Sequence, residues 1–406
     1  MKLQRAKGVR DFAPDEKIVR QAIVEEFKKI FERYGFSPLE TPILERLDVL
    51  SAKYAGGADI LKEMFKLKDQ GGRMLGLRYD LTVPFARFVG MNPKIKMPFK
   101  RYQIGRVFRD GPIKLGRYRE FWQCDVDIVG VKSMKADAEI IALTQDAFKN
   151  LGLDVVIKIN NRKILDAMLE KAGIKKERII PAILAIDKLE KFGEAEVKKE
   201  LKAAKIPEQT IKKLMKSIKT SKANDEIKEL LSNLPNKKNV EFSPSLARGL
   251  AYYTGTIFEV FLKKSKITSA VAAGGRYDEM VGKFIGAGKD YPAVGIAFGL
   301  EVIMDAMKLK RKLGKRTVTD VYIIPIQTFK QSFKIAQQLR NAGIKADIDL
   351  VGRGPSKNLD YANAMWIPYV MFIGPDELKQ KKVKLRDMKT GKEQMLSVSS
   401  VIKKLS

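Results

Sequence analysis

Apolar and polar positions repeat with two different periods along the chain, and the change of period separates predicted helices from predicted strands. Residues 15–34 repeat apolar side chains every three to four positions, which predicts an amphipathic helix. Residues 74–90 combine a short alternating run with Asp80 and Thr82 ahead of Pro84. This pattern predicts a strand followed by a helix that Asp80 and Thr82 cap.

The two-residue period of a strand is clearest between residues 99 and 130. Two alternating runs, FKRYQIGRVFRD and RYREFWQCDVDIVG, are joined by GPIKLG, whose glycines and proline predict a hairpin with a basic tip. Further strands are predicted in TGTIFEVFL, SAVAAGGRYDEMV and AVGIAFGLEVIMDAM, the last of which continues into a helix. From about residue 163 to 240 the patterns are helical and rich in lysine, so we expect a helical insertion between two parts of one sheet.

The basic segment KLKRKLGKRTVT is the predicted linker between two domains. After it, strand and helix patterns alternate, as in a compact α/β domain of ordinary size. We therefore predict an α+β protein with an N-terminal domain at residues 1–318 and a C-terminal α/β domain at residues 319–406.

The charge of the chain points to a polyanionic partner. Lysine and arginine number 78 and aspartate and glutamate 48, which gives a formal net charge of +30. Nucleic acid is the first partner to expect and an anionic membrane surface the second, while a solvated lysine-rich surface is the alternative. With a single cysteine, Cys124, no apolar run long enough to span a bilayer and no signal-peptide pattern, we expect a cytoplasmic protein without disulfides.

The chain contains no histidine. This excludes an imidazole base, a Ser-His-Asp triad, a Cys-His pair and a metal site with histidine ligands. One cysteine cannot build a structural zinc site either. Chemistry by carboxylates, arginine, lysine and magnesium remains, and this set suits phosphate esters.

The second run of the hairpin carries an unusual polar face. Residues two apart share one side of a strand, whereas Cys124 faces the other side and is expected in the core. Two guanidiniums, a phenyl ring, an amide and two carboxylates suit a ligand with a phosphate, an aromatic base and a cationic group. An exposed face of an antiparallel sheet is the alternative. The residues of this face are Arg117, Arg119, Phe121, Gln123, Asp125 and Asp127.

These segments resemble a known family. VFRDGPIKLGRYREF resembles motif 2 and AVGIAFGLE motif 3 of class II aminoacyl-tRNA synthetases, and RGLAYYTG with AAGGRYDEMV resembles the signature motifs of the histidyl-tRNA synthetase family. The likeness covers nearly the whole chain, from KGVRDFAPDE to a C-terminal domain similar to the family's anticodon-binding domain. It implies ATP-dependent ligation of L-histidine to tRNA(His) through a histidyl-adenylate, with ATP and Mg²⁺. It also implies a class II antiparallel sheet and, through motif 1 around Pro42, a homodimer.

The resemblance also implies roles for individual residues. Arg109, Arg248 and Gln123 are the expected catalytic residues, and none is assigned to a metal. ATP contacts are expected from Arg109, Arg117, Phe121, Gly299 and Glu301. Contacts to the amino acid are expected from Asp80, Leu81, Thr82, Arg109, Gln123, Asp127, Arg248, Tyr252, Tyr253 and Tyr277.

Some of these expectations are open. Alternation would place the adjacent Tyr252 and Tyr253 on opposite sides of a strand, so which of them contacts the imidazole is undecided. Arg276 is expected to line the pocket beside Tyr277. The chain also departs from the family's pattern at two positions. Val302 stands where class II enzymes usually carry an adenine-stacking arginine, and Gly111 where an acidic residue is common.

Two other functions fit parts of the pattern. A regulatory paralogue would bind histidine without charging tRNA, and a pure nucleic-acid-binding module would explain the charge. Such regulators tend to lose the ATP-site arginines and the anticodon domain, whereas Arg109, Arg248 and a C-terminal domain are present here. A nucleic-acid-binding module would not need the carboxylates and tyrosines of the pocket.

Overall fold

The computed structural model describes residues 2–52, 62–113, 116–248, 252–285, 291–309 and 317–406. The chain divides into two compact units, residues 1–10 with 22–312, and residues 11–21 with 313–406. Part of the predicted linker, residues 310–316, lies outside the described residues. None of the helices within the described ranges is long and apolar enough to cross a membrane.

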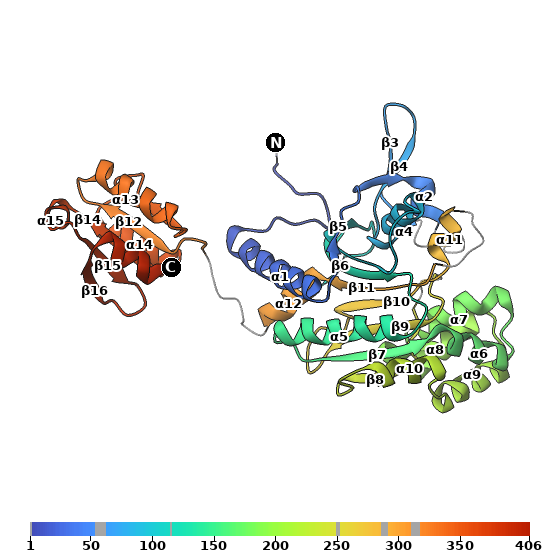
Figure 1. Cartoon of the computed structure of the whole chain (residues 1–406). Coiled ribbons are helices and arrows are strands. Elements are labelled where there is room, and N and C mark those ends of the chain that lie inside the picture. Colours follow the sequence, from blue (N-terminus) through green and yellow to red (C-terminus); the bar gives the residue numbers. More distant parts are fainter. Residues whose placement is uncertain (1, 53–61, 114–115, 249–251, 286–290, 310–316) are drawn as a thin grey trace. The chain divides into compact units, whose positions relative to one another are not determined.

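The first unit is built on an eight-stranded sheet (Figure 1). Its strand order is β1-β5-β6-β11-β10-β9-β7-β8. Neighbours from β5 to β7 pair antiparallel, whereas β1 with β5 and β7 with β8 pair parallel. The predicted antiparallel sheet is therefore confirmed, with parallel pairs at both edges. The strands are β1 (Ser37–Pro38), β5 (Phe99–Phe108), β6 (Glu120–Val129), β7 (Val155–Asn161), β8 (Val240–Phe242), β9 (Thr256–Leu262), β10 (Ala272–Arg276) and β11 (Ala293–Gly299).

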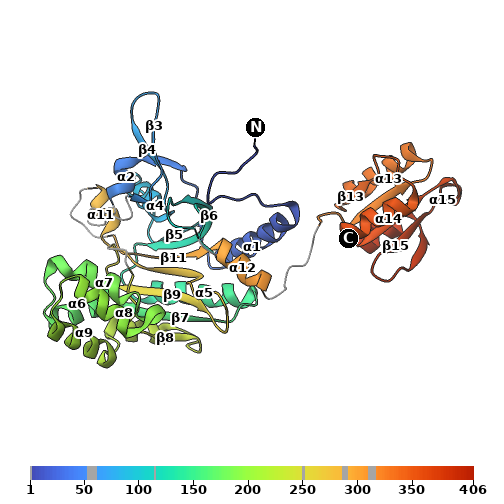
Figure 2. The same cartoon turned by 180° about the vertical axis from the view of Figure 1, so that it is seen from behind.

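One face of this sheet is covered by helices α1 (Pro14–Arg33), α5 (Lys135–Asn150) and α12 (Leu300–Leu309) (Figure 2). Phe298 of β11 lies at the centre, because its ring is 4.9 Å from that of Phe27 on α1 and 5.8 Å from that of Phe148 on α5. Cys124 lies opposite Phe298 in the strand register and is completely buried, as expected. This face therefore forms the core, which leaves the opposite face of β6 for a ligand.

A second layer of the first unit lies around α4 (Thr82–Met91), which packs against α11 (Met280–Ile285). The predicted strand and helix at residues 74–90 are both present. Asp80 Oδ1 accepts the N–H of Val83 and so caps α4, whereas Thr82 is already helical. The layer also contains α2 (Leu47–Ala52) and a small sheet of β2 (Leu44–Arg46), β3 (Lys66–Lys68) and β4 (Met74–Leu77).

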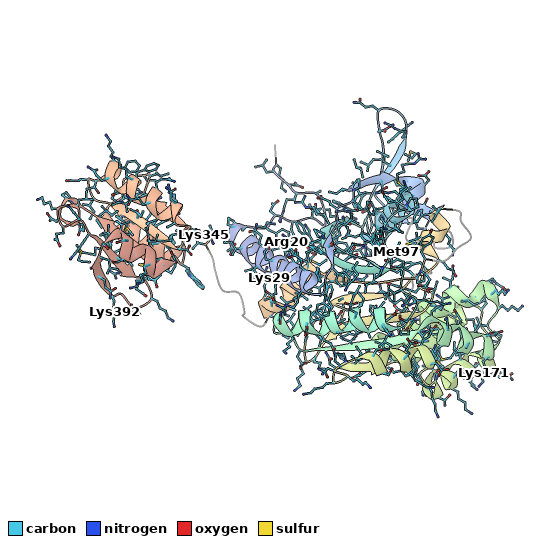
Figure 3. All side chains as sticks on the ribbon, in the orientation of Figure 1. Arg20, Lys29, Met97, Lys171, Lys345 and Lys392 are labelled. Carbon is cyan, nitrogen blue, oxygen red and sulfur yellow. The ribbon has the colours of Figure 1, made fainter. Side chains whose placement is uncertain are left out.

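The helical insertion is confirmed between β7 and β8 (Figure 1). The side chain of Asn161 caps its first helix, and Gly173, at φ 81°, ends that helix in the left-handed conformation that glycine favours. Lys29 on α1 and Lys171 in the insertion are exposed, in keeping with a lysine-rich surface (Figure 3). The insertion comprises α6 (Arg162–Ala172), η1 (Lys176–Arg178), α7 (Ile179–Ile186), α8 (Leu189–Ala203), α9 (Glu208–Thr220) and α10 (Asp225–Asn233).

The C-terminal part of the chain forms a five-stranded sheet in the order β13-β12-β14-β15-β16. Separate apolar clusters lie against α13 and α16 and against α14, so both faces of the sheet are covered. The predicted α/β pattern is confirmed, while α15 and α16 are additional to it. The elements are β12 (Val321–Pro325), α13 (Phe329–Asn341), β13 (Ala346–Ile348), α14 (Pro355–Ala364), β14 (Tyr369–Ile373), α15 (Pro375–Lys379), β15 (Val383–Asp387), β16 (Glu393–Leu396) and α16 (Val398–Leu405).

Candidate active site

A cavity of about 530 Å³ lies on the face of the sheet that the helices leave open. Alternation along β6 directs Phe121, Gln123, Asp125 and Asp127 into it, as the sequence predicts. Arg119 does not line the cavity, because it precedes β6 and its Nη2 lies 2.9 Å from Asp110 Oδ1.

The cavity brings together the predicted site residues from separate parts of the chain. Leu81 is the exception, because its side chain is completely buried. This corrects the predicted Leu81 contact to one that only its main chain can make. Those that line the cavity are Asp80, Thr82, Arg109, Arg117, Phe121, Gln123, Asp127, Arg248, Tyr252, Tyr253, Tyr277, Gly299 and Glu301.

Arg109 lies between two aromatic rings. Its guanidinium carbon is 4.1 Å from the ring centre of Tyr79 and 4.9 Å from that of Phe121, and Nε donates to the Tyr79 carbonyl at 3.3 Å. Burial raises the pKa of Tyr79, so its hydroxyl stays neutral. Cation–π contacts with both rings hold the guanidinium at the cavity wall.

Arg248 lies at another wall of the cavity, beside Tyr253. Its guanidinium carbon is 5.3 Å from the Tyr253 ring centre, and Nη1 is 3.7 Å from Glu259 Oε1. Burial lowers the pKa of Arg248, but its interactions with Tyr253 and Glu259 outweigh burial and leave the pKa above its ordinary value. The side chain therefore carries a permanent positive charge into the cavity.

Tyr252 and Tyr253 both line the cavity. Their ring centres are 4.4 Å apart, and the Tyr252 hydroxyl donates to that of Tyr253 at 3.2 Å. They precede β9, so strand alternation does not separate them. The intervening signature residues 249–251 lie outside the described residues.

Asp127 is a buried carboxylate with two side-chain partners. Its side chain is 4% exposed, Arg101 Nη2 lies 2.6 Å from its Oδ2, and the Tyr277 hydroxyl donates to its Oδ1. Burial and the neighbouring Asp127 raise the pKa of Tyr277 well above its ordinary value, so Tyr277 acts as a donor.

Two glycines make room beside Asp127. Gly295 lies directly opposite Asp127 in the β11–β6 register, and a Cβ there would overlap the Asp127 carboxylate. Gly275 pairs with Gly295 and has a φ of 157°, and a Cβ on it would lie 2.8 Å from the Tyr253 ring. The lack of side chains at both positions leaves the space that the Asp127 carboxylate and the Tyr253 ring occupy on the sheet.

The prediction that Arg276 lines the cavity is wrong. Arg276 is buried and forms an ion pair with Asp137, while its Nη1 donates to the Val131 carbonyl at 3.0 Å. The Thr256 hydroxyl also donates to Asp137. Arg276 ends β10 with its side chain on the face away from the cavity, where it ties the sheet to α5.

Sequence reasoning missed two carboxylates of the cavity. Glu259 interrupts an apolar alternating strand, which is a readable signal, and it faces Arg248. Glu63 has no such signal, yet its carboxylate lies 3.1 Å from where a Cβ on Gly111 would be. Glu63 therefore places a carboxylate beside Gly111, the position at which motif 2 of this chain lacks the acidic residue common in the family. Val302, the motif 3 departure, lines the cavity as an apolar residue.

The antiparallel sheet, its insertion and the cavity on its open face have the architecture of a class II aminoacyl-tRNA synthetase. The family model described as histidyl-tRNA synthetase matches residues 8–303, and the anticodon binding domain model matches residues 320–406. The chain belongs to the histidyl-tRNA synthetase family. It is thus an enzyme of the class that uses ATP, and its family implies tRNA charging.

Relatives match along nearly the whole chain. Histidine--tRNA ligase 1 of Bacillus cereus (strain ATCC 10987 / NRS 248) is 45% identical and covers 99% of this chain and 97% of its own length. The histidine--tRNA ligase of Aeropyrum pernix is 39% identical over 91% and 90%. The crystal structure of histidyl-tRNA synthetase from Nostoc sp. PCC 7120 superposes with a TM-score of 0.85 at 29% identity, covering 100% and 99%. The regulatory alternative is not favoured by these matches.

Proposed function

We propose that the protein joins L-histidine to tRNA(His) in two steps, through a histidyl-adenylate made in the cavity. The observation that carries the proposal is the meeting of Arg109 and Arg248, from distant segments, with the carboxylates and tyrosines on one open sheet face. Two guanidiniums beside a nucleotide-sized cavity suit a reaction in which negative charge gathers on a phosphate.

The amino-acid end of the cavity fits histidine. Asp80, Thr82 and Gln123 would hold the α-ammonium, while Asp127 and the tyrosine pair would read the imidazole. A site that pairs both ring nitrogens rejects apolar isosteres, because its own buried polar groups would otherwise lose their partners.

The nucleotide end would hold ATP. Arg109 would bind the α-phosphate with its two-pronged guanidinium, and Phe121 would stack on adenine. Arg117, Gly299 and Glu301 border the same cavity and complete this end.

The first step then needs no acid or base from the protein. A histidine carboxylate oxygen attacks the α-phosphorus, and pyrophosphate leaves. Arg248, charged at every physiological pH, would stabilise the charge that builds up on the phosphate oxygens. In the second step the terminal ribose hydroxyl of tRNA attacks the adenylate carbonyl and AMP leaves.

The proposal includes Mg²⁺, which would bind together with ATP. Within the described ranges no group of three or more acidic or cysteine side chains is arranged to hold a metal ion. Mg²⁺ would be held mainly by the oxygens of its nucleotide. Bound there, Mg²⁺ would offset the charge of the phosphates.

The remaining parts of the chain would serve tRNA. The net charge of +30 suits an RNA partner, since phosphate contacts dominate such affinity. The insertion would steady the acceptor arm and the C-terminal domain would read the anticodon. A cytoplasmic location belongs to the same proposal, in keeping with a single, buried cysteine.

Charging of tRNA tests this function. With ATP, Mg²⁺ and radiolabelled L-histidine, the protein is expected to acylate a tRNA(His) transcript and to leave a transcript with another anticodon and acceptor end unlabelled. Equal labelling of both transcripts, or of neither by folded protein, would contradict the proposal.

A homodimer is also proposed, because several apolar side chains of the small sheet are exposed. Leu44, Leu67 and Met74 are 51%, 42% and 49% exposed. Sedimentation equilibrium is expected to give twice the mass of one chain, and Leu44→Glu to shift the protein toward a monomer. Leu350→Glu, at a 73% exposed leucine of the C-terminal unit, is the control and should leave the dimer intact. A monomeric unaltered protein would refute the dimer.

A further inference from the structure

A buried arginine stands behind Asp127. The side chain of Arg101, on β5, has no exposed area, and Arg101 lies directly opposite Asp127 in the β5–β6 register. Its Nη2 is 2.6 Å from Asp127 Oδ2, and its guanidinium carbon is 4.2 Å from the ring centre of Phe85 on α4. Arg101 does not line the cavity, so its influence on a ligand passes through the residues that it contacts.

Arg101 also connects two walls of the cavity. Its Nη2 donates to the Leu81 carbonyl at 3.4 Å, and Leu81 stands between Asp80 and Thr82, both of which line the cavity. One guanidinium therefore fixes the carboxylate of β6 relative to the segment that leads into α4.

The geometry of Asp127 suits a nitrogen donor in the cavity. The Tyr277 hydroxyl donates to Oδ1, whereas Arg101 forms an ion pair with Oδ2, and an ionised carboxylate accepts up to about four hydrogen bonds. The Asp127 carboxylate occupies the space that a side chain at Gly295 would fill. A carboxylate that lines the cavity suits a nitrogen donor such as an imidazole N–H.

The charge of Asp127 depends on its neighbours. Arg101 on β5 is the cation paired with it, and Tyr277 is a neutral donor. Asp125, two positions along β6 on the same face, adds a like charge that favours protonation. From β11, Gly295 lies opposite Asp127, and from α4, Phe85 packs against Arg101. Neither residue carries a charge.

We propose that Arg101 is a positioning residue for histidine recognition, keeping Asp127 ionised and oriented so that its carboxylate accepts an imidazole N–H. This inference rests on the proposed function. Without the cation, burial favours the neutral carboxyl, which presents a donor where the imidazole N–H needs an acceptor. Arg101 would then set the pH range over which the pocket reads histidine.

The test is the Michaelis constant for histidine in ATP–pyrophosphate exchange, measured with Arg101→Met across about pH 8 to about pH 6. Free histidine titrates in the same way in the assays of the variant and of the unaltered protein. The ratio of their Michaelis constants for histidine therefore reports only the change in the pocket. We expect this ratio to rise by about tenfold to a hundredfold toward the acidic end, while the constant for ATP stays the same. Arg101→Lys, which keeps the charge, should retain the original pH profile.

Two further variants separate this role from a structural one. In Arg101→Met combined with Asp127→Asn, the added pH dependence should vanish, because the titrating group is gone. Arg87→Met is the matched control, since it breaks the Arg87–Glu45 pair of α4 and β2 without touching the cavity. This substitution should lower thermal stability, and the ratio of the Michaelis constants for histidine should not change with pH.

The experiments distinguish a variant that does not fold, and a protein that lacks the proposed activity, from an incorrect role for Arg101. If Arg101→Met does not fold, Arg101→Gln, which removes the charge but keeps a polar side chain with N–H donors, is assessed in the same way. A ratio that does not change with pH, or that rises equally in Arg87→Met, would overturn the inference. Absence of histidine-dependent exchange by the unaltered protein would instead contradict the proposed function.

Discussion

Arg248→Ala is expected to slow histidine activation by about 100- to 1,000-fold, with a much smaller change in histidine affinity. The reason is that the guanidinium faces the charge that develops during attack on the phosphate, and this charge is small in the ground state. Because its pKa is raised, Arg248 stays protonated, so the loss should be constant from about pH 6 to about pH 9. Single-turnover formation of adenylate measures the rate, and calorimetric titration with histidine measures the affinity.

The control for this prediction is Arg248→Lys. Lysine keeps a positive charge beside the partly buried Glu259. It lacks the planar fork and should recover only part of the rate. Equal losses of rate and affinity in Arg248→Ala would show that the residue merely positions the substrate.

The second large effect is expected from Gly295→Ala. Its methyl group would occupy the space of the Asp127 carboxylate and lie 2.7 Å from the Val126 carbonyl. Overpacking of this kind costs about 1–3 kcal/mol, and here it displaces the side chain that would read the imidazole. We expect kcat/KM for histidine to fall by about a hundredfold, and steady-state exchange measures it.

Gly90→Ala is the matched glycine control. Gly90 lies inside α4, and a Cβ there would meet its nearest neighbour at 3.8 Å, an ordinary contact. Alanine also favours a helix, so this variant should be fully active and slightly more stable. Unchanged kcat/KM for histidine in Gly295→Ala would contradict the placement of the imidazole beside Asp127.

Local periodicity was enough to predict much of the fold. The face of β6 followed from alternation that persists over the whole strand, and the insertion from helical periodicity. Both features depend on residues that are close in sequence, so the pattern of apolar and polar positions predicts them directly. The pair of Tyr252 and Tyr253 lies before β9, where this logic no longer applies.

Partners distant in sequence could not be predicted in the same way. Arg101 meets Asp127 only through the β5–β6 register, and the connection from residue 109 to residue 119 is too long for its sequence to fix that register. The failure for Arg276 has a similar cause, because its partner Asp137 comes from α5, far away in sequence. Buried charge pairs between separate elements are therefore the part of the site that required coordinates.

The central claim is that this cavity activates histidine with ATP. Histidine-dependent ATP–pyrophosphate exchange in the absence of tRNA tests it most directly. The account predicts rapid incorporation of labelled pyrophosphate into ATP with L-histidine and Mg²⁺, and none above background with other amino acids. No exchange above background with folded protein, or exchange that another amino acid supports equally well, would contradict it.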